Sequence, residues 1–159
     1  MADVPTDCIA YVDETGIDTC IYREYGWSER GKPLVGTISG RKFKRTSIVA
    51  AQMGRSIFSP MQFQGTMDST LFEQWFGEYL LPCMPPKTVI VMDNASFHRK
   101  RKLLTMAENA GFRLIFLPPY SPELNPVEKF WVWLKRFLRK TLSTHTSFDD
   151  ALRSAFQVR

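Results

Sequence analysis

Two short apolar runs that each end in an aspartate constrain the fold of this chain most. Residues 8–13 read CIAYVD and residues 87–93 read KTVIVMD, so Asp13 and Asp93 each follow a segment rich in strand-forming residues. The second run is almost continuously apolar, which is typical of a strand covered on both faces. We expect the two strands to lie side by side, with both aspartates at the crevice formed by their carboxyl ends.

The remaining patterns predict the other elements of one sheet and its helices. Further strands are predicted at residues 45–53, 56–64 and 112–117, and helices at residues 71–80, 97–109 and 126–140. The first two of these strands form a hairpin at Gly54 and Arg55, and the first helix is capped by Asp68 or Ser69 and stopped by Pro82 and Pro85-Pro86. The order predicts an α/β fold: a five-stranded mixed sheet, with three antiparallel strands and then β-α-β-α, flanked by helices.

Length and composition indicate one compact domain over residues 1–159. The hydrophobic content of 44% suffices for an ordinary core, and no run approaches the roughly 18 to 20 apolar residues of a membrane helix. The first ten residues also lack the basic and apolar regions of an export signal. We therefore expect a cytoplasmic protein without a membrane partner, in which Cys8, Cys20 and Cys83 are reduced thiols.

Positive charge is distributed unevenly along the chain. The net charge is +5, and residues 126–159 hold seven basic and three acidic residues. Two further clusters contain no acid: Arg41, Lys42, Lys44 and Arg45, and then Arg99, Lys100, Arg101 and Lys102. Such patches favour a polyanionic partner, although charge alone is equally compatible with solvated surface.

The predicted pair of aspartates indicates a divalent cation. Two carboxylates within a few ångströms of each other repel unless a cation neutralises them. Oxygen ligands suit Mg²⁺ or Mn²⁺, which leave positions for water and substrate phosphate. A third acid would allow two ions about 4 Å apart, the arrangement that activates a nucleophile and stabilises the leaving oxygen in phosphodiester chemistry.

Glu123 and Glu128 are the two candidates for the third acid. With Asn125 as its cap, the last predicted helix holds Glu128 on its first turn, whereas Glu123 lies in a proline-rich turn. At about 100° per residue, Glu128, Lys135 and Arg139 fall on one line of the helix. This pattern favours Glu128 as a metal ligand, with the two cations holding the backbone of the strand being cut.

Three segments of the chain resemble the signature blocks of a known family. YVDETGI, VIVMDNASFH and LPPYSPELNPVEKFW resemble the three blocks of DDE-type transposases of the mariner superfamily, especially its bacterial insertion-sequence branch. Between Asp93 and Glu128 lie 34 residues (94–127), which is that family's spacing for its Asp, Asp, Glu triad. The resemblance extends from about Cys8 to Leu142.

The resemblance implies a ribonuclease H-like fold and a DNA transposase catalytic domain. Asp13, Asp93 and Glu128 then hold two Mg²⁺ (or Mn²⁺) ions for hydrolysis at transposon ends and transfer of the 3′-hydroxyl into target DNA. Asn94 and His98 match the second block and are expected to orient the loop or a phosphate. The expected assembly is a homodimer on DNA, associated with the nucleoid.

The DNA contacts that we predict outside the triad are basic, with one aromatic residue. They are Lys135, Arg139, Arg99, Lys100, Arg41, Lys42 and Trp27, the last in a glycine-punctuated loop. Phe130 and Trp131 fall on the apolar arc of the last helix and are predicted to be core residues. Glu14 is predicted to point away from Asp13, because neighbouring strand residues face opposite sides.

The front of the chain departs from the family pattern, because only twelve residues precede Asp13. We therefore expect the helix-turn-helix modules of relatives to be absent here, and DNA binding to show little sequence preference or to depend on a separate DNA-recognition polypeptide. Two other functions stay open: a catalytically inactive DNA-binding or assembly remnant, and a ribonuclease H-like nuclease acting on RNA or hybrids.

Overall fold

A five-stranded mixed sheet forms the centre of the computed structural model, which describes residues 8–17, 45–119 and 121–158. Its strands are β1 (Ile9–Ile17), β2 (Thr46–Met53), β3 (Ser56–Gln64), β4 (Val89–Met92) and β5 (Arg113–Phe116). They lie in the order β3-β2-β1-β4-β5, where β2 pairs antiparallel with β1 and β3, and β4 pairs parallel with β1 and β5. The predicted five-stranded mixed sheet is confirmed.

The helical segments follow the sheet strands closely in sequence. They are α1 (Ser69–Trp75), η2 (Phe76–Leu80), α2 (Leu81–Cys83), α3 (Lys100–Asn109), η3 (Pro122–Leu124), α4 (Val127–Thr141), η4 (Leu142–Thr144) and α5 (Phe148–Gln157). Asp68 caps α1 by accepting a 2.8 Å hydrogen bond from the backbone nitrogen of Leu71. The prediction was wrong for Pro82, which lies in the first turn of α2, where proline is tolerated. It was right for Pro85-Pro86, since the helical stretch ends at Cys83, with Met84 extended before Pro85.

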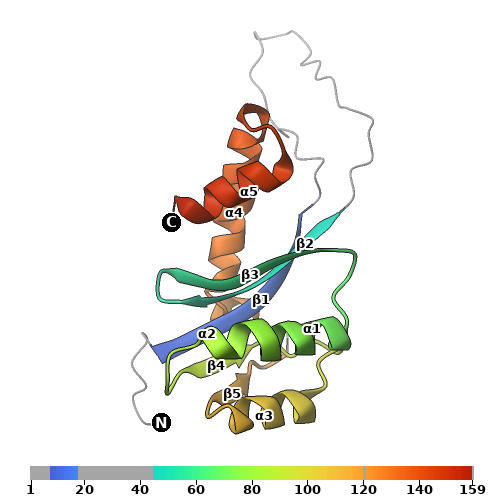
Figure 1. Ribbon diagram of the computed structural model, residues 1–159, viewed down its shortest axis with the longest axis vertical. Helices are drawn as coiled ribbons and strands as arrows, with labels where there is room; N and C mark the ends of the chain where they lie inside the picture. The colour runs from blue at the N-terminus through green and yellow to red at the C-terminus, as the bar shows by residue number, and fades with distance from the viewer. Residues whose placement is uncertain (1–7, 18–44, 120, 159) are drawn as a thin grey trace.

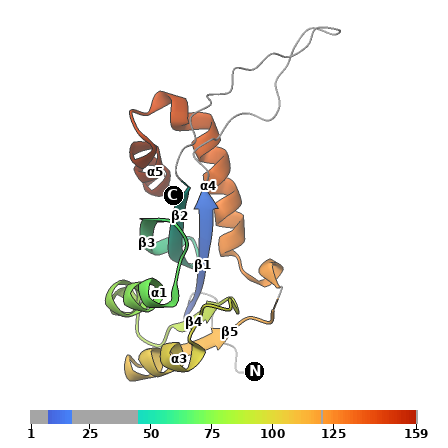
Figure 2. The ribbon, with the colours of Figure 1, turned by 90° about the vertical axis from the view of Figure 1, so that its right-hand side faces the viewer.

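The helices cover both faces of the sheet, as Figures 1 and 2 show. Strand β1 alternates between the two resulting cores. Ala10 and Val12 pack in the core that contains α1 and α3 residues, whereas Ile17 packs in the core that contains α4 and α5 residues. By the same alternation Asp13 faces α4 and Glu14 faces the opposite side.

Strand β1 continues four residues beyond Asp13, so our prediction that Asp13 ends its strand was wrong. The reason lies in the two neighbours of β1. The antiparallel partner β2 still pairs with β1 at Ile17, whereas the parallel partner β4 pairs only as far as Val12. Asp13 therefore stands where β1 loses one neighbour while the other holds it in place.

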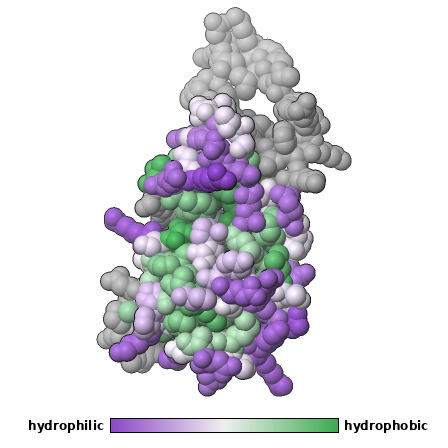
Figure 3. All heavy atoms as spheres, viewed as in Figure 1, coloured by the Kyte–Doolittle hydropathy of each residue, from purple (hydrophilic) through white to green (hydrophobic). Residues whose placement is uncertain are grey.

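Helix α5 was not anticipated from the sequence. It begins after Ser147, whose hydroxyl oxygen accepts a 3.1 Å hydrogen bond from the backbone nitrogen of Asp150, and it buries Ala151 and Ala155 beside α4. Figure 3 shows hydrophobic residues over the middle of the face that carries α1, and hydrophilic ones around its margin. Within the described residues, no helix is long and apolar enough to cross a lipid bilayer.

Candidate functional site

The register of two parallel strands brings Asp13 and Asp93 together. Val12 pairs with Met92 in the last step of the β1 and β4 ladder, and Asp13 and Asp93 directly follow these two residues in the chain. Adjacent parallel strands lie about 4.8 Å apart, so the two backbones are close neighbours at this point. The crevice that we predicted for the carboxyl ends of the strands is therefore present at the end of the ladder.

Helix α4 supplies the third acid to the same place. Its apolar arc buries Val127, Trp131 and Leu134 in the core beside β1, which brings Glu128 on its first turn to the crevice. Asp13, Asp93 and Glu128 line one cleft of about 430 Å³. The loop after β5 closes the other side of this cleft with Leu117, Pro118, Pro119, Ser121 and Pro122.

Asp13 is held in a poorly solvated position. The buried indole of Trp131 donates a 2.9 Å hydrogen bond from Nε1 to its Oδ2. Burial of the carboxyl group, with the charge of Glu128 as the second cause, raises the pKa of Asp13 from 3.8 to about 7, although the indole hydrogen bond works in the opposite direction. Trp131 is thus a core residue, as predicted, but its contact with Asp13 was not foreseen.

Asp93 is more open and rests against a buried histidine. Its side chain is 51% exposed, and its Oδ1 lies 3.1 Å from Nε2 of His98, whose own side chain is 3% exposed. The imidazole packs between the rings of Phe72 and Phe97, with centroids 4.4 and 4.3 Å away. This arrangement fixes one oxygen of Asp93 against a rigid group.

Glu14, which the alternation of strand residues predicts to point away from Asp13, also borders the site. It does face away from α4, but a second hollow contains Glu14 together with Asp13, Asp93, Glu128 and His98. Burial, followed by the charge of Asp93, raises the pKa of Glu14. The predicted direction of Glu14 is therefore correct, and Glu14 still lines a hollow shared with the three acids because it directly follows Asp13 at the end of the β1 and β4 ladder.

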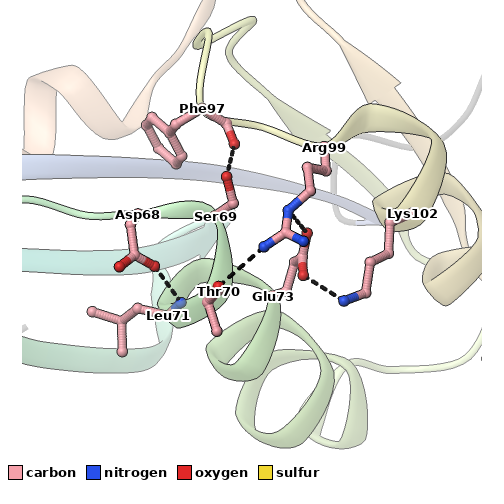
Figure 4. Close-up of polar contacts among 8 residues, drawn as sticks. All are labelled: Asp68, Ser69, Thr70, Leu71, Glu73, Phe97, Arg99 and Lys102. Carbon is pink, nitrogen blue, oxygen red and sulfur yellow. Dashed lines mark hydrogen bonds and ion pairs between the residues drawn. The ribbon is translucent and has the colours of Figure 1, made fainter.

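A buried carboxylate on α1 engages two cations of the second basic cluster, one of which, Arg99, is a predicted DNA contact. Glu73 is 5% exposed, and its oxygens lie 3.0 Å from Nε of Arg99 and 2.6 Å from Nζ of Lys102 (Figure 4). The guanidinium of Arg99 also donates a 3.0 Å hydrogen bond to Thr70. These contacts tie the start of α3 to α1 and support the loop that carries His98, so the structure gives Arg99 a partner other than DNA.

The other predicted DNA contacts differ in where they lie. Arg139 is exposed and Lys135 is half-buried on α4, while the exposed Lys100 lies with Nζ 5.7 Å from the ring centroid of Phe116. Trp27, Arg41 and Lys42 lie outside the described residues.

The donor atoms at the cleft suit a hard divalent cation. All three acids offer oxygen, and the cleft also contains Asn94, whose Oδ1 is buried without a hydrogen-bond partner in the described structure. Among the described residues, no three His, Cys, Asp or Glu side chains converge closely enough to hold an ion. The residue types therefore fit such an ion, and its binding requires the three carboxylates to draw together.

Comparisons with known proteins give a consistent result. The sequence profile described as DDE superfamily endonuclease matches residues 8–151. An uncharacterized protein of Sinorhizobium fredii, y4pE/y4sA, is 40% identical over 62 residues, which cover 39% of this chain and 41% of that protein.

Solved structures that resemble this chain include Mos1 transposase structures and a retroviral intasome. A Mos1 transposase in a paired-end complex with the left transposon end gives a TM-score of 0.67 at 16% identity, covering 96% of this chain and 52% of that one. The Mos1 transposase catalytic domain with raltegravir and Mg gives 0.61 at 15%, covering 96% and 69%. A chain of the simian T-cell lymphotropic virus intasome in complex with PP2A regulatory subunit B56 gamma gives 0.63 at 17%, covering 96% and 48%. These likenesses establish a ribonuclease H-like fold, and this chain spans about half the length of the Mos1 chain in the paired-end complex.

Proposed function

Because this chain belongs to the DDE superfamily endonuclease family, we propose that it is the domain of a transposase that cuts and joins DNA. The observation that carries the proposal is the cleft itself. Asp13, Asp93 and Glu128 come from two strands and a helix, and all three line it. The proposed reaction is hydrolysis of a phosphodiester bond at a transposon end, followed by attack of the freed 3′-hydroxyl on target DNA.

We propose that these three carboxylates hold two Mg²⁺ or Mn²⁺ ions. Matched Mos1 transposase complexes contain Mn or Mg, which supports the use of a divalent ion. Bound ions of this kind activate the attacking oxygen and stabilise the leaving oxygen. The raised pKa of Asp13 fits the proposal, because a cation restores the charged form of a carboxylate that burial disfavours.

The neighbours of the acids would orient them. Trp131 engages Oδ2 of Asp13, which leaves Oδ1 as the oxygen with the greater freedom to bind an ion. Nε2 of His98 lies 3.1 Å from Oδ1 of Asp93 and restrains that oxygen. Both supporting rings are buried, so their own rotation is restricted and the two carboxylates keep a defined direction.

A basic line on α4 is proposed to hold the DNA backbone next to the cleft. Lys135 follows Glu128 by seven residues and Arg139 follows it by eleven, which places the three within about 40° of one another around the helix. The two cations therefore lie along the same side of α4 as the acid that lines the cleft. Phosphates bind such cations without regard to base sequence.

The proposed partners are transposon-end and target DNA, with two copies of the chain acting together. Matched Mos1 structures are paired-end and strand transfer complexes, which supports DNA as the partner. The proposed contacts of Lys135 and Arg139 are to phosphates, which carry no base-sequence information. We therefore propose that a separate DNA-recognition polypeptide supplies recognition of the terminal sequence.

A nicking assay on supercoiled DNA tests the proposal. Wild-type protein should nick DNA in Mg²⁺ or Mn²⁺ but not in a chelator, and Asp93→Asn and Glu128→Gln should each lower the rate by at least about a hundredfold. Glu123→Gln, an exposed change on η3, is the matched control and should leave the rate unchanged. Full activity of Asp93→Asn would refute the assignment, and a preference for an RNA–DNA hybrid would favour a ribonuclease.

A further inference from the structure

Asn125 connects the strand and the helix that carry two of the three acids. It is 4% exposed and lines the cleft. Its Nδ2 donates a 3.2 Å hydrogen bond to the carbonyl oxygen of Val12, and its Oδ1 accepts a 3.3 Å hydrogen bond from the backbone nitrogen of Val127. Val12 directly precedes Asp13, and Val127 directly precedes Glu128. A single amide side chain therefore joins the backbones next to both acids.

The connection matters because it is a directional contact between the backbone of β1 and the start of α4. The helix and the strand meet mainly through apolar packing, which is not directional and permits small sliding movements. Hydrogen bonds are directional, so the two bonds of Asn125 set the offset of Val127 from Val12. The bond from Trp131 acts one turn further along the helix and on a side chain, not on the backbone.

We propose that Asn125 is a positioning residue that fixes the separation of the Asp13 and Glu128 carboxylates for metal binding. The inference rests on the proposed function, since it assumes that these acids share an ion. The chemistry of the position favours an amide, which is a donor and an acceptor at once. Serine could replace the acceptor for Val127 as an ordinary helix cap, but its short side chain has no second arm for Val12.

Two substitutions separate the helix cap from the bridge to the strand. Asn125→Ser retains an acceptor for Val127 and removes the bond to Val12, whereas Asn125→Ala removes both. Asn109→Ser, at the exposed end of α3, is the matched control. The measurements are Mn²⁺ affinity by calorimetry and the unfolding temperature without metal.

Metal affinity should depend on the hydrogen bond from Asn125 to Val12, and stability on the hydrogen bond from Val127 to Asn125. We expect Mn²⁺ binding to weaken by about 10- to 100-fold in both Asn125 variants, and to stay within about twofold of the wild type in Asn109→Ser. The unfolding temperature should fall less in Asn125→Ser than in Asn125→Ala. DNA affinity without metal should change less than about twofold in Asn125→Ser, since the cations on α4 are retained.

A folded Asn125→Ser protein with wild-type Mn²⁺ affinity would overturn the inference. If Asn125→Ala fails to fold, Asn125→Ser decides the outcome alone, because it keeps the cap. The titration is independent of catalysis. A wild-type protein that binds Mn²⁺ but does not nick DNA would refute the proposed function, while the Mn²⁺ affinities of the variants would still decide the role of Asn125.

Discussion

Nε1 of Trp131 donates a 2.9 Å hydrogen bond to Oδ2 of Asp13, across the interface between α4 and β1. The indole is 1% exposed and belongs to the same core as Val127 and Leu134. A residue that packs the helix onto the sheet therefore also stabilises the charged form of an acid in the cleft. Trp131 thus both packs α4 onto β1 and orients the carboxylate of Asp13.

Replacing this indole should move the pH dependence of nicking. In Trp131→Phe the donor is lost, so the pKa of Asp13 rises further above about 7. The curve of nicking rate against pH should therefore move toward higher pH by about one unit, which lowers the rate at pH 7 roughly tenfold. Trp75→Phe, which loses an indole bond of 2.8 Å to the carbonyl of Ser59, should lower stability without moving the profile. Identical profiles for the two variants would contradict the role of Trp131.

The stability of the metal-free protein should depend on the ionisation of Asp13. The pKa in the folded state, about 7, lies above the ordinary value of 3.8, so the folded state retains a proton that the unfolded state loses. This contribution is fully present below pH 3.8 and is lost as the pH rises through about 7. Asn cannot ionise, so Asp13→Asn should abolish this pH dependence and raise the unfolding temperature at pH 8 by on the order of 5 °C relative to the wild type, whose Asp13 is charged there. Thermal unfolding in a chelator between pH 5 and 8 measures the difference, and parallel curves would count against a perturbed Asp13.

Removing the two cations that pair with Glu73 should destabilise the protein much more than removing the cations and the charge of Glu73 together. Removing both cations in Arg99→Ala with Lys102→Ala leaves a buried carboxylate without a partner, which should cost about 3 to 5 kcal/mol in the free energy of unfolding. Adding Glu73→Gln should recover much of this loss, because the buried charge is then absent. Urea denaturation provides the measurement. Asp149→Asn, which alters an exposed hydrogen bond to Gln62, is the control and should change stability by less than about 1 kcal/mol. Additive losses in the triple variant would contradict the pairing of the two cations with the buried carboxylate of Glu73.

The basic line on α4 should determine the salt dependence of DNA binding. Replacing Lys135 and Arg139 with alanine removes two phosphate contacts, so the slope of log affinity against log salt should fall by about 2. Binding should weaken to a similar extent for unrelated DNA sequences. Arg55→Ala, in the turn between β2 and β3, should leave the slope unchanged. Equal slopes for the α4 variant and the wild type would exclude these residues as phosphate contacts.

Much of the fold could be predicted from local patterns. The alternation and composition of the strands identified all five, and Asp68 marked the start of α1. The end of β1 could not be predicted in this way. Its length depends on continued pairing with β2, a tertiary contact that the residues after Asp13 do not reveal. Helix α5 did carry a local signal, in Ser147 followed by Asp149 and Asp150, which was overlooked.

The partners of the candidate site were harder to foresee than the acids. Asp13, Asp93 and Glu128 stand out by spacing, whereas Trp131 looks like any apolar helix residue until the helix docks on β1. Glu73 also resembles a surface charge in sequence, because its burial arises from α3 lying against α1. Contacts between distant segments therefore account for most of what sequence patterns missed.

Diffraction from crystals of the protein soaked in Mn²⁺ tests the central claim most directly, because the anomalous signal locates the ion without reference to activity. The account predicts at least one Mn²⁺ bound by oxygens of Asp13, Asp93 and Glu128, at about 2.0 to 2.3 Å, with the three carboxylates drawn together around it. Crystals with Mn²⁺ elsewhere but none in this cleft, or with the three carboxylates held more than about 8 Å apart, would contradict it.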